Sequence, residues 1–298
     1  MLVDTHTHFY DEWLLPDAEA AIQRALEAGV GKMIQADVDS RERPAMWEIG
    51  RRHPGVLFQM AGLYPGSVTA DNWKDELDIV YSIVNGWGHC PFLREKKADA
   101  TERATSPSTE NKVDARSGPG MTEKETGMSG IVAIGEIGLD YHEGKEFVKE
   151  QKEVLRAQLE LAAAKDLPVN IHLRDAWEDL LGIFKDCRHL NLRGNLHCFS
   201  GSYEVYRQAN LYGEWSVGIG GVVTFKNSGL AKTLQDIPME RILLETDAPY
   251  LAPVPHRGER NESALLPLVA AKVAEIKGLS TEEVADITTQ NSERLFNI

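Results

Sequence analysis

Cysteine is scarce in this sequence. Only Cys90, Cys187 and Cys198 occur among 298 residues, an odd number at irregular spacing. Such a set forms neither a disulfide framework nor a cysteine-based zinc cluster. Long apolar runs are also missing, because no stretch approaches the about 20 residues of a membrane-spanning helix, and no signal peptide stands at the start. We therefore expect a cytoplasmic protein that does not enter a membrane.

Positive charge is in short supply as well. Lys and Arg number 32 against 46 Asp and Glu, which leaves a formal charge of −14. Broad, salt-driven wrapping of nucleic acid depends on a basic surface and is excluded as the main activity. Nucleic acid is still possible as a substrate, because bound divalent cations reverse the local field inside an acidic protein.

Short apolar runs alternate with segments of helical spacing along the chain. The runs predict eight strands, over residues 2–8, 32–37, 56–64, 131–136, 168–172, 195–199, 214–221 and 241–247. Apolar runs without polar alternation are typical of a parallel sheet that is covered on both faces. Eight such units favour an α/β fold of the closed (β/α)₈ barrel type over a doubly wound open sheet.

One stretch, residues 86–129, interrupts this alternation between the third helix and the fourth strand. From residue 93 onward it has no aromatic residue and is rich in Ser, Thr, Glu, Lys and Gly. A segment of this composition buries too little apolar surface to offset its ordering entropy. We expect a disordered insertion in a single domain that spans residues 1–298.

Side chains that bind metals gather where predicted strands end. These residues are His6 and His8 on the first strand, Glu136 on the fourth, His172 on the fifth, His197 on the sixth and Asp247 on the eighth. Each alone has an ordinary explanation as a rim or capping residue. In a barrel, however, all the carboxyl ends of the strands converge on one face, where active sites of this fold lie. The six together predict a metal site.

Six protein ligands exceed what one ion usually takes, so we expect two divalent ions. Glu136 has two oxygens and can bridge them, with His6, His8 and Asp247 on one ion and His172 and His197 on the other. Imidazole and carboxylate ligands suit Zn²⁺, Mn²⁺ or Mg²⁺. Such a pair activates a bridging water for attack on phosphorus or a carbonyl, and Asp247 can accept its proton.

Several motifs in this order resemble the TatD family of metal-dependent deoxyribonucleases, in the amidohydrolase superfamily. They are DTHTH (4–8), AIGEIGLDYH (133–142), VNIHLRDA (169–176), LHCFSG (196–201), ETDAPYLAP (245–253) and RGERNE (257–262). The resemblance implies a barrel hydrolase that uses two ions, typically Mg²⁺ or Mn²⁺, and trims DNA from 3′ to 5′. It also implies the same six ligands.

The chain departs from the family at GLYPGS (62–67), where Tyr64 replaces a histidine next to the substrate. We expect Tyr64 to donate a hydrogen bond to phosphate but to carry protons poorly at neutral pH. Arg174 could clamp a phosphate oxygen. Arg257, Arg260 and Asn261 lie in the loop after the last strand, and we expect them to contact substrate.

Two other functions stay open at this point. A related hydrolase could use the same ions on an ester or amide, such as the ester of an aminoacyl-tRNA. A barrel that has lost catalysis could serve as a binding protein, although all six ligands are present. No segment indicates an obligate protein partner, so we expect a monomer or weak oligomer.

Overall fold

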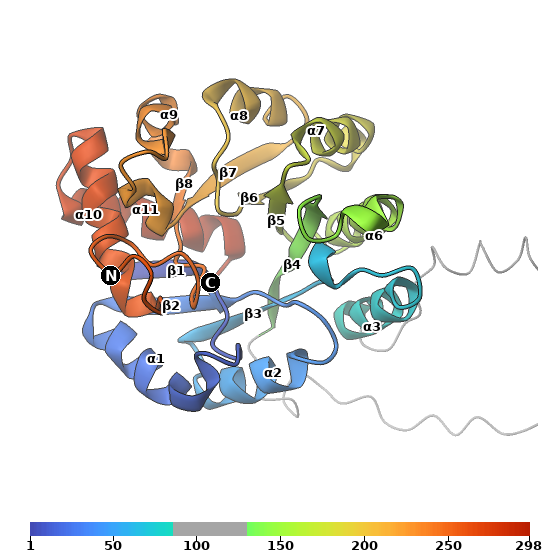
Figure 1. The fold of residues 1–298 in the computed structure, drawn as a ribbon, viewed down its shortest axis with the longest axis horizontal. Helices are drawn as coiled ribbons and strands as arrows, with labels where there is room; N and C mark the ends of the chain where they lie inside the picture. Colours follow the sequence, from blue (N-terminus) through green and yellow to red (C-terminus); the bar gives the residue numbers. More distant parts are fainter. Residues whose placement is uncertain (86–129) are drawn as a thin grey trace, which may run out of the picture.

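The computed structural model describes residues 1–85 and 130–298, and the predicted insertion lies outside the described residues. Eight strands stand inside a ring of helices (Figure 1). They form one sheet in the order β1 to β8, and all neighbours are parallel. The strands are β1 (Leu2–Thr7), β2 (Val30–Gln35), β3 (Leu57–Ala61), β4 (Ile131–Asp140), β5 (Val169–Arg174), β6 (Arg193–Leu196), β7 (Glu214–Ile219) and β8 (Ile242–Leu244).

The sheet curls until its first strand meets the segment that follows its last one. Thr7 and Ala248 form a parallel bridge. The amide of His8 donates to the carbonyl of Ala248 at 2.8 Å, and the amide of Asp247 donates to the carbonyl of His6 at 2.9 Å. These bonds close the barrel and confirm the predicted (β/α)₈ architecture. They also bring residues about 240 positions apart into one site.

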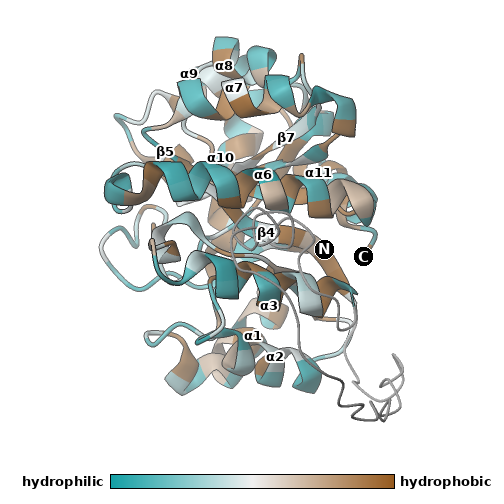
Figure 2. Ribbon diagram, turned by 90° about the vertical axis from the view of Figure 1, so that its right-hand side faces the viewer, coloured by the Kyte–Doolittle hydropathy of each residue, from teal (hydrophilic) through white to brown (hydrophobic). Residues whose placement is uncertain are grey.

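The helices pack around the strands with one face buried. Hydrophilic and hydrophobic residues alternate along α6 and α7, as expected for helices that face both core and solvent (Figure 2). Among the described residues, no helix combines the length and apolar character needed to cross a bilayer. The helices are α1 (Ala18–Glu27), α2 (Arg43–Arg52), α3 (Trp73–Asn85), α6 (Val148–Ala164), α7 (Trp177–Asp186), α8 (Tyr203–Ala209), α9 (Leu230–Asp236), α10 (Leu266–Lys277) and α11 (Thr281–Phe296).

Several strand ends differ from the prediction, among them those of β3, β5 and β6, and the differences at β4 and β8 concern the site. β4 does not end at Glu136 but continues to Asp140, with a register irregularity against β5 between Ile134 and Ile137. β8 ends at Leu244, so Asp247 lies in the following loop with a left-handed φ of 56°. Hydrophobicity alone places strand ends poorly, because polar residues continue a strand when the barrel interior gives them partners.

A small apolar cluster fills part of the barrel interior. Ile34, Met60, Ala133 and Leu243 are fully buried there, and Phe296 from the end of α11 packs with them. Side chains in such a layer interdigitate rather than enclose a channel. The interior of the barrel is therefore packed with apolar side chains, and the polar side chains gather at the carboxyl ends of the strands.

Candidate metal centre

The six predicted ligands meet at the carboxyl ends of the strands. Five of them line a cavity of about 660 Å³. The sixth, His6, is fully buried and stacks on His197 with ring centroids 3.5 Å apart. Only the closed barrel could bring these side chains together, since they come from five different strand ends.

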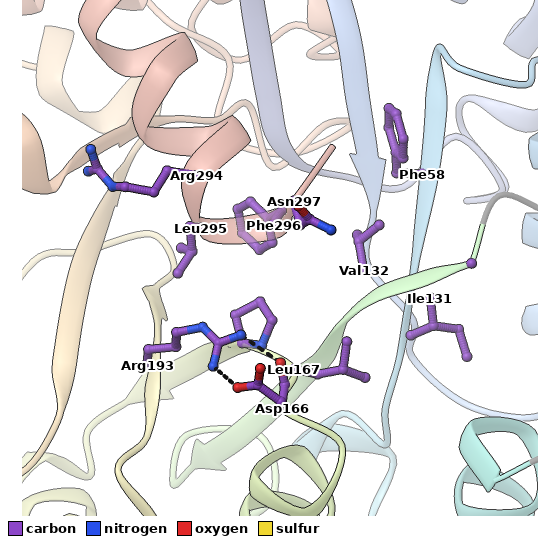
Figure 3. A pocket seen from close by; sticks show the side chains of 12 residues that line it. Phe58, Ile131, Val132, Asp166, Leu167, Arg193, Arg294, Leu295, Phe296 and Asn297 are labelled. Atoms are coloured by element: carbon purple, nitrogen blue, oxygen red, sulfur yellow. Dashed lines mark hydrogen bonds and ion pairs between the residues drawn. The ribbon is translucent and has the colours of Figure 1, made fainter.

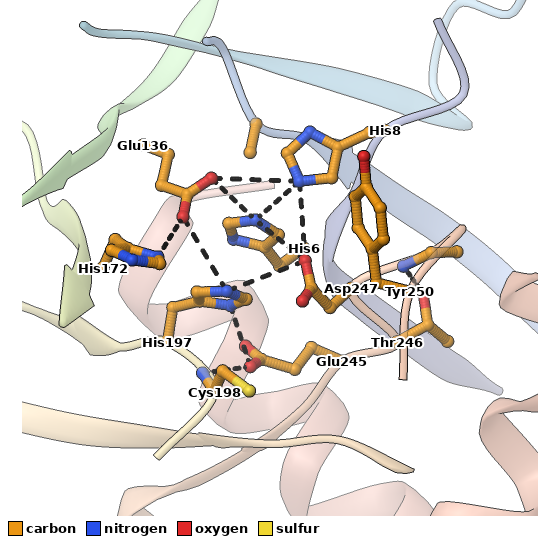
Figure 4. Close-up of polar contacts among 12 residues, drawn as sticks. His6, His8, Glu136, His172, His197, Cys198, Glu245, Thr246, Asp247 and Tyr250 are labelled. Atoms are coloured by element: carbon orange, nitrogen blue, oxygen red, sulfur yellow. Dashed lines mark hydrogen bonds and ion pairs between the residues drawn. The ribbon is translucent and has the colours of Figure 1, made fainter. Parts of the chain in front are cut away.

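Glu136 lies within reach of four imidazoles of the cluster (Figure 4). Its Oε2 lies 3.3 Å from His6 Nε2 and 3.8 Å from His8 Nε2. Its Oε1 lies 2.8 Å from His172 Nδ1 and 3.9 Å from His197 Nε2. Each carboxylate oxygen thus faces a different pair of imidazoles.

Asp247 approaches the same imidazoles from the opposite side. Its Oδ1 lies 3.5 Å from His8 Nε2 and 3.7 Å from the Nε2 atoms of both His6 and His197. Three overlapping groups of donor atoms lie within 4.8 Å of one another. They are His6, His8 and Glu136; Glu136, His172 and His197; and His6, His197 and Asp247.

Each imidazole is held from behind by a second polar group. His8 Nδ1 lies 2.8 Å from the Tyr10 hydroxyl. The other contacts are His6 Nδ1 to Asn170 Oδ1 at 3.1 Å, His172 Nε2 to Asp140 Oδ2 at 2.9 Å, and His197 Nδ1 to Glu245 Oε1 at 3.0 Å. Such partners orient metal-binding imidazoles and select their tautomer.

The tautomers of His6 and His8 follow from these partners. The Tyr10 hydroxyl donates to the carbonyl of Ala36, so it accepts from His8 Nδ1. Asn170 Oδ1 is also an acceptor, so His6 Nδ1 donates to it. The two Nε2 atoms are left with lone pairs that face each other at 3.1 Å. Neutral imidazoles repel in this arrangement, whereas a cation between them and the carboxylates stabilises it. The donor set therefore fits a divalent metal ion.

The charges of the cluster are strongly coupled. Burial opposes ionisation of Glu136, but His6 and the hydrogen bond from His172 outweigh it and hold the Glu136 pKa well below 4.5. Burial likewise lowers the pKa of His197, yet Glu245 and Asp247 raise it to about 10. Without metal, the carboxylates retain protons on neighbouring imidazoles, and a metal ion would take the place of that positive charge.

The residues behind the imidazoles escaped the sequence prediction. Tyr10 lies two residues after His8, Asn170 two before His172 and Glu245 two before Asp247, while Asp140 lies four after Glu136. Asn170 shares β5 with His172, and Asp140 shares β4 with Glu136, so even spacing along a strand is a usable signal for these two partners. Tyr10 and Glu245 lie beyond the ends of β1 and β8, where strand periodicity does not apply.

Two of the predicted substrate contacts lie in the cavity. Arg174 and Tyr64 both line it. The Tyr64 ring packs edge-on against His172 with centroids 4.9 Å apart, and its hydroxyl lies 3.5 Å from Asp140 Oδ2. Arg174 pairs with Glu143 at 3.2 Å. Both side chains therefore lie beside the candidate metal ligands.

Three predicted substrate contacts in the loop after β8 lie away from the cavity. Among the described residues, the cavity lining does not include Arg257, Arg260 or Asn261. Arg257 lies over the ring of Phe225 at 4.6 Å, and Arg260 binds Asp17. Asn261 is fully buried and its amide donates to the carbonyls of Thr246 and Tyr250. Asn261 thus holds the loop in place, and its expected contact with substrate stays a prediction.

Acidic side chains surround the mouth of the cavity. Asp11, Glu42 and Glu143 line it together with Arg174, which already pairs with Glu143. The mouth is consequently negative.

A second cavity, of about 610 Å³, lies near the amino ends of β3, β4 and β5 (Figure 3). Its described lining contains no histidine, and its clearest polar feature is the ion pair between Arg193 and Asp166. Active sites of this fold lie at the other end of the barrel. The cavity of the histidines is therefore the candidate site.

A (β/α)₈ barrel with a buried His, Glu and Asp cluster at its carboxyl face defines a metal-dependent hydrolase. Comparison with known proteins identifies the family: the profile described as TatD related DNase matches residues 3–297, and the chain belongs to this family.

Relatives extend over the whole chain. The "uncharacterized metal-dependent hydrolase YabD" of Bacillus subtilis is 35% identical over 100% of both chains. The "3'-5' ssDNA/RNA exonuclease TatD" of Erwinia tasmaniensis is 30% identical and covers 95% of this chain and 94% of its own. The solved structure of the TatD homolog YJJV from Escherichia coli K12 has a TM-score of 0.76 at 26% identity, covering 100% of this chain and 98% of its own.

Proposed function

We propose that this chain is a two-metal phosphodiesterase that degrades DNA from the 3′ end. The observation that carries the proposal is the position of Glu136, with one oxygen toward His6 and His8 and the other toward His172 and His197. A carboxylate in this position can bridge two ions. The name of the Erwinia relative, a 3′-5′ exonuclease of single-stranded DNA and RNA, supports the same class of substrate.

The residues of the cavity would have separate roles in hydrolysis. Bound divalent ions, held by the six ligands, would polarise the phosphoryl group and make a water nucleophilic at neutral pH. Asp247 could accept the proton of that water: burial raises its pKa, but His197 and His8 outweigh this and hold the pKa below 3.8. Arg174 could clamp a free phosphate oxygen, and Tyr64 could donate a hydrogen bond to another.

The acidic mouth supports attack at a strand end rather than within a strand. A continuous strand lying across the cavity would bring several phosphates close to Asp11, Glu42 and Glu143. A terminus that enters the cavity brings one phosphate to the metal ions and leaves the others outside. Like charges at close range oppose the first arrangement.

The test uses protein stripped of metal and reloaded with Mg²⁺, Mn²⁺ or Zn²⁺. Substrates are 5′-labelled single-stranded DNA, the same DNA with its 3′ end blocked by phosphorothioate linkages, an RNA of equal sequence, and an aminoacyl-tRNA. We expect a ladder of DNA products that shortens from the 3′ end, and no ladder from the blocked strand.

Other outcomes would overturn the proposal. Equal cleavage of blocked and unblocked DNA would show an endonuclease. Release of the amino acid without cleavage of DNA would show the esterase alternative. The metal-free protein serves as the control and should be inactive on every substrate.

A further inference from the structure

Two large aromatic side chains are exposed beside the cavity. Trp13, in the loop between β1 and α1, is 57% exposed, and Tyr250, in the loop after β8, is 44% exposed. Their ring centroids lie 6.0 Å apart with the planes inclined by 51°. We call these two residues the aromatic rim. Exposed aromatic rings in contact with one another indicate a binding surface more often than isolated ones do.

The aromatic rim is held rigidly by hydrogen bonds. Asp11 accepts from the Tyr250 hydroxyl at 2.7 Å with one oxygen and from the Trp13 amide at 2.8 Å with the other. The carbonyl of Trp13 accepts from Arg260 at 2.9 Å, and Arg260 is bound to Asp17 at 2.6 Å. Two loops from opposite ends of the sequence are thus fastened together. A surface that is already ordered loses little conformational entropy when it binds a ligand.

The aromatic rim is continuous with the metal centre. Tyr250 lines the cavity, and its ring centroid lies 6.4 Å from that of His8. Figure 4 shows Tyr250 beside Asp247 and His8. Tyr250 therefore lies between His8, which is a candidate ligand, and Trp13 at the surface.

We propose that the aromatic rim stacks one unpaired base of the substrate strand, next to the phosphate that is cleaved. The inference rests on the proposed function and adds a subsite to it. Aromatic faces bind any base through its π surface, so the subsite is tolerant of sequence. A base inside a duplex has both faces covered by its neighbours, so the subsite favours single strands or frayed ends. The acidic mouth argues for the same mode, because binding through the base does not depend on the phosphate charge.

The experiment compares Trp13→Ala with Trp13→Phe and with Leu211→Ala. Leu211 is 73% exposed in the loop before β7 and does not line the cavity, so it is a matched control. Each metal-loaded protein receives a short single-stranded DNA and the same strand with abasic residues at its two 3′-terminal positions. For the intact strand we expect Trp13→Ala to raise KM roughly 5- to 100-fold with kcat unchanged, the effect of losing one stacked base.

For the abasic strand we expect wild type and Trp13→Ala to have the same KM. Trp13→Phe should keep most of the wild-type affinity, and Leu211→Ala all of it. An equal loss on intact and abasic strands would mean that the substitution merely disturbs the loop, and would overturn the proposal. So would an unchanged KM, or a change in the mass of the protein in solution, which would make the rim a contact between copies.

A binding measurement separates this proposal from the proposed function. With the metal-loaded protein and labelled strands made resistant to cleavage by phosphorothioate linkages, fluorescence anisotropy reports affinity without cleavage. If the wild type binds the intact strand more tightly than the abasic one and Trp13→Ala removes the difference, the stacking site stands even where no cleavage is found. If the wild type does not distinguish the two strands, the stacking site is wrong, whatever the enzyme cleaves.

Discussion

At the scale of the residue, the proposed two-metal centre depends on the charge of Glu136. Each of its two oxygens faces a different pair of imidazoles, whereas Asp247 approaches three of the imidazoles with a single oxygen. A neutral amide of the same shape keeps the packing but offers only one oxygen as a ligand and no charge. Substitution of Glu136 by glutamine therefore tests the role of its charge without changing the shape of the side chain.

Glu136→Gln should lose metal and activity together. We expect metal affinity and turnover to fall at least about 100-fold, beyond the usual effect of removing an outer partner. Metal content by mass spectrometry and turnover on single-stranded DNA measure this. Glu245→Gln is the matched control, because its only ion pair with a candidate ligand is with the outer nitrogen of His197; this substitution should weaken metal binding by about 10- to 100-fold. A Glu136→Gln protein with two ions and wild-type turnover would refute the bridge.

We expect Tyr64 to limit proton transfer in the cavity. Burial and the charge of Glu136 raise the pKa of its hydroxyl far above 10, so it exchanges no proton at neutral pH. Tyr64→His places a group that titrates near neutrality at the same point, and general acid catalysis typically contributes 100-fold or more. We expect at least about 10-fold faster cleavage of single-stranded DNA. Tyr64→Phe keeps the ring and should bring no gain. An unchanged rate in Tyr64→His would contradict this account of the position.

At the scale of the element, a buried ion pair joins the segment after β2, helix α2 and the end of β3. Asp37 binds Arg43 at 2.7 Å, and both side chains are almost fully buried. Asp37 also accepts from the Gly62 amide, and Arg43 donates to the Gly62 carbonyl. The backbone of Asp37 in turn bonds Gly135 and Glu136. Through these bonds the pair supports the strand that carries the bridging carboxylate.

Breaking this pair should cost more stability than breaking a pair close by whose arginine is exposed. Arg43→Met leaves the charge of Asp37 buried without a partner, and we expect a loss of about 3–5 kcal/mol in the free energy of unfolding. Arg41→Met is the control, since Arg41 is 79% exposed and binds Asp39 at 2.6 Å; it should cost about 1 kcal/mol or less. Urea denaturation measures both. Equal losses of unfolding free energy in Arg43→Met and Arg41→Met would show that the buried pair contributes no more stability than the other pair.

At the scale of the whole molecule, the described residues contain a complete candidate centre. All six ligands and their four outer partners lie within residues 6–10, 136–140, 170–172, 197 and 245–247. The chain between α3 and β4 contributes none of them, and β3 pairs with β4 directly. The ten residues of the candidate centre thus come from the parts of the chain on either side of that stretch.

Deleting residues 93–129 should therefore leave metal content unchanged and turnover within a few-fold. The composition of this stretch offers little apolar surface to bury, so its removal should not unfold the barrel. Turnover and bound metal of the shortened protein measure this. A collapse of activity with metal content intact would show that the stretch belongs to the substrate site.

Much of the site was predictable from local patterns. A histidine pair after an apolar run, or a glutamate inside IVAIGE, indicates a candidate ligand near the active face, and six such candidates converge only in a barrel. The ends of β4 and β8 were less predictable, because Asp140 and Asp247 owe their conformations to partners on other strands. The buried position of Asn261 was not predictable for the same reason: its neighbours are charged, while its own amide faces the backbone of Thr246 and Tyr250.

The sequence by itself determined the order of strands and helices, the eightfold count and the six side chains that can bind metal. These depend on hydrophobic periodicity and residue chemistry, which are local. Tertiary structure alone decided which oxygen of Glu136 faces which imidazoles and which groups hold the imidazoles from behind. It also decided that Trp13 would meet Tyr250 at the rim. Those relations appear only when β1 closes against the segment after β8, because contacts between residues 240 positions apart leave no trace in local spacing.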